Sequence, residues 1–142
     1  MGAVLIGVLL FSIYAFLSGY KDGILYAGKG AESFKWNEHI LYVLERFVVA
    51  LILLIGFYYE SVVDIGVVLF CAMLGFSLWH NGAYYLSAGR ILDNGYVFSS
   101  NSRSSTARIE LTFRVRMWMF VISWWVLITY GFFRLDLLLG WQ

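Results

Sequence analysis

The sequence has no proline, one cysteine and two histidines in 142 residues, and only 13% of its residues are charged. A soluble domain usually contains about 25% charged and about 45–50% apolar residues. Because 61% of this chain is hydrophobic, it has too little polar surface for a water-soluble globule, a disordered chain or a nucleic-acid binder. The lone Cys71 excludes an internal disulfide and therefore a disulfide scaffold. Proline is otherwise common in membrane helices, so its absence predicts straight helices.

Long apolar runs are what the sequence contains instead. A membrane-spanning helix needs about 20 predominantly apolar residues. Segments at about residues 2–20, 39–59, 62–82 and 113–133 meet this requirement. Residues 1–142 are therefore predicted to form a single integral membrane domain, an all-α four-helix transmembrane bundle.

The distribution of basic residues predicts how this bundle is oriented. Arg134 follows the last span, whereas most other lysines and arginines lie in or beside the two long connections: Lys21, Lys29, Lys35, Arg90, Arg103, Arg108, Arg114 and Arg116. By the positive-inside rule, loops 21–38 and 89–112 are cytoplasmic and both termini lie outside, with a short outer hairpin between the second and third spans. We expect the protein in a bacterial inner membrane, or as a phage-encoded membrane protein, in contact with membrane lipid.

Ionisable residues at membrane depth are costly, so they are the candidate functional residues. One set is predicted to converge on the cytoplasmic leaflet: Glu45, Arg46, His80, Asn81, Arg114 and Arg116. A second set is predicted at the outer end: Glu60, Asp64 and Arg134. The arginines of the first set could extend to anionic headgroups while Glu45 pairs with one of them. Alternatively, the first set lines a polar pocket that opens to the cytoplasm.

These residues leave three functions open. Because no catalytic set, metal-ligand spacing or cofactor motif is found, the first is a non-enzymatic membrane subunit. It would act in a homo-oligomer or with other membrane subunits, and without nucleic acid. The second is a small ion channel or transporter with a path through Glu45, Arg46, Asp64 and Arg114. The third is membrane electron transfer with a b-type haem between His39 and His80.

The second cytoplasmic loop carries a turn signal. Asp93-Asn94-Gly95 is typical of a tight hairpin, and residues 91–92 and 96–98 would be its short flanks. The sequence therefore predicts a small hairpin directly after the third span.

Three short motifs resemble those of small four-span membrane proteins of bacterial and phage genomes. They are Asn37-Glu38-His39 before the second span, His80-Asn81-Gly82-x-Tyr84-Tyr85 at the end of the third, and Ser105-Thr106-Ala107 in the second loop. The similarity covers about residues 20–116 and implies no activity. It does direct attention to the cytoplasmic boundary, where the first polar set is predicted.

Overall fold

The computed structural model of the chain describes residues 1–27, 44–45, 47–49, 51–52, 55–93, 95–101 and 111–139. In these ranges the chain forms three long helices, α1 (Gly2–Ala27), α3 (Val62–Leu92) and α4 (Phe113–Leu139), and no strand. All three are long and apolar enough to cross a membrane. The described part of the chain is therefore all-helical and has the character of a membrane-embedded protein, as the composition predicts.

The second predicted span, 39–59, falls largely outside the described residues. The parts of it that are described, residues 44–45, 47–49 and 51–52, are helical. The other three predicted spans correspond to α1, α3 and α4, and the predicted starts at 2, 62 and 113 coincide with the first residues of these helices.

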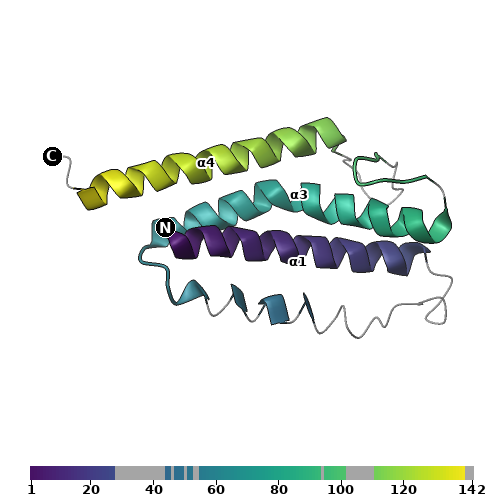
Figure 1. Cartoon of the computed structure of the whole chain (residues 1–142), viewed down its shortest axis with the longest axis horizontal. Coiled ribbons are helices and arrows are strands. Elements are labelled where there is room, and N and C mark those ends of the chain that lie inside the picture. The colour runs from purple at the N-terminus through teal and green to yellow at the C-terminus, as the bar shows by residue number, and fades with distance from the viewer. Residues whose placement is uncertain are drawn as a thin grey trace.

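α1 and α3 lie side by side and run in the same direction (Figure 1). Gly7 of α1 lies next to Val68 of α3, and Gly19 lies against the backbone of His80, so residue numbers rise together along the two helices. A side chain at Gly19 would collide with that backbone, because a Cβ atom there would lie 2.7 Å from the His80 Cα. The absence of a side chain thus permits close approach of the two helices.

α4 runs antiparallel to α3. In the first third of α3 and near the middle of α4, the Ser123 hydroxyl donates a hydrogen bond of 3.0 Å to the Cys71 carbonyl oxygen, and the Cys71 thiol donates one of 3.3 Å to the Ser123 carbonyl oxygen. This reciprocal pair joins two small residues, so the helix backbones can approach closely there. Around it lies the apolar core, which consists of Val4, Val8, Val68, Cys71, Leu127 and Tyr130.

All three helices are longer than predicted. The loops expected at 21–38 and 89–112 begin later, after Ala27 and Leu92, and α4 continues past residue 133 to Leu139. Gly23 does not end α1, because it lies against Ser87 and the Tyr84 carbonyl of α3 and is needed there for close packing. Helix α3 ends at Asp93, which adopts the left-handed conformation typical of a helix terminus, with φ of 50°. The hairpin predicted around residues 93–95 is therefore wrong, since its first flank is the last turn of α3.

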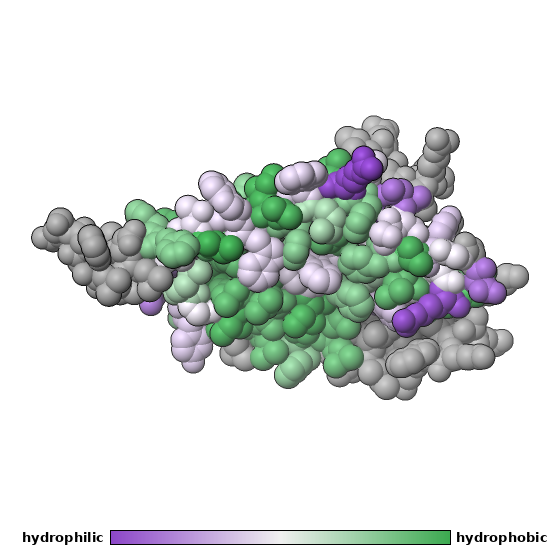
Figure 2. Space-filling view, turned by 45° about the horizontal axis from the view of Figure 1, so that its top comes forward, coloured by the Kyte–Doolittle hydropathy of each residue, from purple (hydrophilic) through white to green (hydrophobic). Residues whose placement is uncertain are grey.

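Most of the surface of the three helices is not buried against the rest of the chain. Only 28% of the most apolar stretch of α1 and of α3, and 22% of that of α4, is buried inside the molecule. Figure 2 shows apolar residues over the middle of one face and the most hydrophilic residues gathered towards the right. The helices therefore present a broad apolar surface to lipid or to other proteins.

Candidate functional site

A buried carboxylate lies where α3 begins. Asp64 is only 2% exposed, and its Oδ2 accepts hydrogen bonds of 2.9 Å from the backbone N–H groups of Glu60 and Ser61. The Ser61 hydroxyl donates a further bond of 3.1 Å to the same oxygen and accepts one from the Asp64 N–H. This reciprocal capping box satisfies the free N–H groups at the helix start. The first role of Asp64 is therefore to fix the beginning of α3.

The second oxygen of Asp64 connects α3 to α4. The Tyr130 hydroxyl donates a hydrogen bond of 2.6 Å to Oδ1. One turn further along α4, Arg134 donates to the Glu60 carboxylate and lies 3.8 Å from Asp64 Oδ2. The structure thus brings together Glu60, Asp64 and Arg134, and we refer to these three with Ser61 and Tyr130 as the outer cluster. Because both oxygens of Asp64 are occupied, the cluster holds two helices together and leaves no free carboxylate.

The predicted cytoplasmic set is divided among separate contacts at the other end of the helices. Lys21 Nζ lies 2.6 Å from Glu45 Oε2, with both side chains 14% exposed. His80 Nε2 lies 3.2 Å from Asp22 Oδ2, and His80 Nδ1 lies 3.3 Å from Asn81 Oδ1. Among the described residues Glu45 pairs with Lys21, because α1 continues past residue 20 and brings Lys21 to it; the expected pairing of Glu45 with Arg46 lies outside the described residues. Both contacts join α1 to another part of the chain.

Arg116 is fully buried at the start of α4, with 0% exposure. Its Nη2 donates hydrogen bonds of 2.7 Å to the Ser100 carbonyl oxygen and 3.3 Å to Asn101 Oδ1. The guanidinium carbon lies 5.6 Å from the centre of the Tyr85 ring, a cation–π contact. The expectation that Arg116 extends to lipid headgroups is therefore wrong, because its side chain is buried and its Nη2 binds a loop of the same chain.

Residues 95–101 fold back over the end of α3. The Phe98 ring fills the space beside Gly82 and lies 6.0 Å from the Trp79 ring, measured between ring centres. Asn101 Oδ1 also accepts a hydrogen bond of 2.6 Å from the Phe113 N–H, at the first turn of α4. The loop is thus bound to α3 by a ring and to α4 by Asn101 and Arg116.

The remaining predicted site residues do not form one continuous site. Arg46 and His39 lie outside the described residues, and Arg114 is exposed at the start of α4. About 24 Å of helix, at about 1.5 Å per residue, separates Asp64 from His80 on α3. The apolar core occupies the described residues between these two levels. In the described ranges, no cluster of histidine, cysteine or carboxylate side chains is arranged to hold a metal ion.

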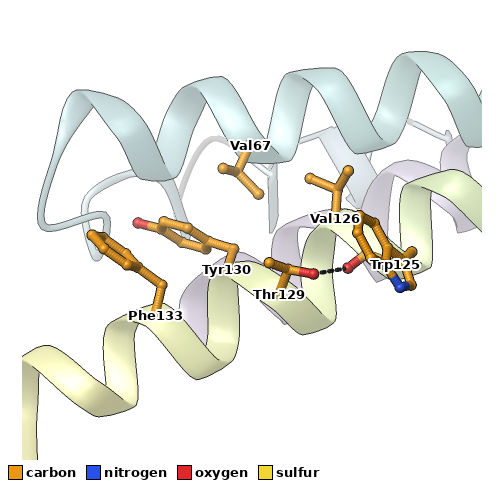
Figure 3. Close-up of a pocket in the computed structure, with 6 residues that line it drawn as sticks. All are labelled: Val67, Trp125, Val126, Thr129, Tyr130 and Phe133. Carbon is orange, nitrogen blue, oxygen red and sulfur yellow. Dashed lines mark hydrogen bonds between the residues drawn. The ribbon is translucent and has the colours of Figure 1, made fainter.

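The outward face of α4 carries two exposed tryptophans. Trp118 is 68% exposed and Trp125 is 69% exposed. A shallow groove of about 330 Å³ lies between α3 and α4 (Figure 3) and is lined by Val67, Trp125, Val126, Thr129, Tyr130 and Phe133. The hydroxyl groups of Thr129 and Tyr130 line the groove, but both are already used as hydrogen-bond donors. Thr129 donates to the Trp125 carbonyl oxygen at 2.9 Å, and Tyr130 donates to Asp64. The groove therefore offers an almost entirely apolar lining.

No protein-family model, curated protein or solved structure matches the chain. The resemblance to small four-span membrane proteins of bacteria and phages therefore stays a prediction.

Sequence reasoning missed several residues that make these contacts. The Ser61-x-x-Asp64 spacing is a capping-box pattern and could have identified the start of α3. No sequence signal identifies Tyr130, Lys21 or Asp22, because their partners depend on which helix faces which.

Proposed function

We propose that this protein is a non-enzymatic integral membrane subunit that acts as a homo-oligomer or within a larger membrane assembly. The observation that carries the proposal is how its polar side chains are used. Asp64 binds Tyr130, Lys21 binds Glu45, and Arg116 binds the loop at Ser100, so these groups hold the chain itself together. The surface that remains for other molecules is apolar and aromatic.

The proposed architecture is a bundle of four spans with both termini outside. Support comes from the parallel arrangement of α1 and α3: two spans that run in the same direction require the chain to recross the membrane between Ala27 and Val62. The helical residues at 44–45, 47–49 and 51–52 lie in that connection. By the positive-inside rule, the basic residues of the loops favour a cytoplasmic position for the start of α4 and the end of α3, and we propose a bacterial inner membrane.

The polar residues are separated into groups at the two ends of the bundle, and this separation also favours a subunit over a pore. A conducting path needs polar groups or water along its length. Asp64 and the Lys21–Glu45 pair lie at opposite ends of the bundle, and Val68 and Leu127 lie in the core between them.

The test is the state of association in a bilayer. The full-length chain, labelled with one fluorophore, is reconstituted at one copy per several thousand lipids, and photobleaching steps are counted for each spot. Affinity purification from native membranes in a mild detergent identifies other bound subunits. We expect two or more copies per spot or a stoichiometric co-purifying membrane protein. Single-step bleaching together with no co-purifying protein would refute the proposal.

A further inference from the structure

The sequence of α1 is repeated in α3. Residues 6–26 align with residues 65–85 without a gap. The first part of the repeat is Ile6-Gly-Val-Leu-Leu-Phe11 against Ile65-Gly-Val-Val-Leu-Phe70, and the last part is Ser18-Gly-Tyr-Lys-Asp-Gly-Ile-Leu-Tyr26 against Ser77-Leu-Trp-His-Asn-Gly-Ala-Tyr-Tyr85. An apolar composition alone does not place serine, glycine and tyrosine at the same spacing twice, whereas a repeated structural unit does. We therefore treat α1 and α3 as two versions of one helix.

The structure places the two versions side by side and at nearly the same level. α1 and α3 run in the same direction (Figure 1), with Gly19 against the backbone of His80. The alignment pairs His80 with Lys21, which lies about 3 Å along α1 from Gly19. Residues that correspond in the last part of the repeat are therefore close to one another along the α1–α3 contact.

The two versions differ in the kind of charge that they carry at this level. Lys21-Asp22 of α1 corresponds to His80-Asn81 of α3, so a lysine in one version is replaced by a histidine in the other. Lys21 pairs with Glu45 at 2.6 Å, whereas His80 contacts α1 itself, with its Nε2 3.2 Å from Asp22 Oδ2. Histidine is the side chain whose charge ordinarily changes between about pH 5 and 8. The contact between the two versions therefore contains a group that gains or loses a proton near neutral pH.

Both ring nitrogens of His80 face oxygen atoms. Besides the contact of Nε2 with Asp22, Nδ1 lies 3.3 Å from Asn81 Oδ1, and the amide nitrogen of Asn81 is turned to Ser77, to which it donates at 3.4 Å. A neutral imidazole carries one N–H and can donate to only one of the two oxygens, whereas an imidazolium carries two. The protonated ring therefore makes two hydrogen bonds where the neutral ring makes one, and it places a positive charge beside a carboxylate.

Protons can reach this contact, and Asp22 is the charged group that touches the ring. The side chains of His80 and Asp22 are 21% and 44% exposed. In the described part of the chain, the other charged groups packed near this level of α1 and α3 have partners of their own. Lys21 pairs with Glu45, and Arg90 donates to a tyrosine hydroxyl of α1 at 3.5 Å. The charge on the ring therefore acts mainly on the carboxylate of Asp22.

We propose that His80 and Asp22 form a pH-sensitive contact, which holds the ends of α1 and α3 together when His80 is protonated and weakens as the pH rises towards 8. Aspartate ordinarily stays ionised above about pH 5, so between pH 5.5 and 8 only the histidine side of the contact changes. Raising the pH removes the positive charge and one N–H, and lowering it restores both. Because the two residues belong to one chain, the inference does not depend on whether the chain associates with other subunits.

The contact is tested by measuring the distance between the two helix ends in the full-length chain. Spin labels are attached at Leu25→Cys and Ile91→Cys in a Cys71→Ser background, since both positions are exposed near the ends of α1 and α3. Pulsed electron resonance gives the distribution of distances at pH 5.5 and 8 in phosphatidylethanolamine–phosphatidylglycerol bilayers, with an excess of unlabelled chain to exclude distances between copies. An ion pair that is partly exposed changes such an equilibrium by about threefold. We expect the ratio of separated to joined helix ends to rise by about threefold at pH 8.

The repeat supplies the matched variants. His80→Lys introduces the residue found at the corresponding position of α1 and stays charged at both pH values, so the distances should no longer depend on pH. Asp22→Asn introduces the residue found at the corresponding position of α3, and without the carboxylate the pH dependence should also disappear. A control pair of labels at Leu5→Cys and Ile65→Cys reports on the other end of the same two helices, where the described residues include no histidine. Its distances should be the same at both pH values.

A distance that lengthens at pH 8 in the parent chain, but not in His80→Lys or Asp22→Asn, supports the proposal. Equal distances at both pH values in a parent chain that circular dichroism shows to be helical would refute it. His80→Gln, which is neutral at both pH values, covers the remaining case. If the pH dependence persists in this variant, a different group causes it, and His80 is refuted as the residue that responds to pH.

Discussion

The contact between Gly19 and the backbone of His80 is expected to set the distance between α1 and α3. Replacing Gly19 by alanine adds one methyl group at the point where the two helices are closest. The nearest atoms are the carbonyl and Cα of His80, which are part of a helix and cannot rotate away as a side chain could. The helices must therefore move apart, and the Asp22–His80 contact next to this point is strained with them.

The expected magnitude follows from the distances. The new Cβ would lie 2.7 Å from the His80 Cα, whereas carbon atoms are in favourable contact at about 3.5–4.0 Å. A displacement of roughly 1 Å is therefore required, and overpacking of this kind costs about 1–3 kcal/mol. The better helix propensity of alanine returns up to about 1 kcal/mol. We expect Gly19→Ala to lower the free energy of unfolding by about 1–2 kcal/mol.

Gly66→Ala is the matched control, because no atom lies within 4 Å of a Cβ at that exposed position of α3. It gains the same helix propensity without the collision and should stabilise the chain by about 0.5–1 kcal/mol. The assay is reversible unfolding of the full chain in mild detergent by titration with a denaturing detergent, monitored by circular dichroism. A Gly19→Ala variant as stable as the Gly66→Ala variant would refute the close approach of α1 and α3.

Two further predictions concern the ends of the bundle. Tyr130→Phe removes the 2.6 Å hydrogen bond to Asp64 and should lower the free energy of unfolding by about 1.5–3 kcal/mol, measured by the same titration; an unchanged value would show that α3 and α4 are joined without this bond. Arg116→Gln removes the bond of 2.7 Å to the Ser100 carbonyl and should release the loop 95–101. Chymotryptic cleavage after Phe98 should then become at least about tenfold faster than in the parent chain, and equal rates would contradict the role assigned to Arg116.

The starts of the three described helices could be predicted from the sequence, but their ends could not. Apolar runs begin sharply after charged or polar residues, which is why 62 and 113 are correct. Gly23 and Gly89 were expected to lie in loops, yet both lie within helices. Gly89 lies against the backbone of Tyr96, as Gly23 lies against α3. Whether a glycine ends a helix or permits close packing depends on its neighbour in space, which one sequence does not specify.

Position along the helix axes is a one-dimensional property, and the sequence predicts well which residues lie at the same level. Counting residues from the span ends is enough to assign Glu60, Asp64 and Arg134 to one level, where the structure brings them together. The sequence does not predict the rotation of each helix about its own axis. This rotation decides that Glu45 meets Lys21 and that Arg116 turns inward, and the apolar helices of the described chain carry little periodicity from which it could be derived.

In lipid, apolar burial gives little preference for one helix rotation over another, because a neighbouring helix and a lipid tail are equally apolar. Rotation must then be specified by the few polar contacts and small residues. In this chain the Cys71–Ser123 pair and the outer cluster fix how α4 faces α3, and Gly19 with His80 fixes how α1 faces α3.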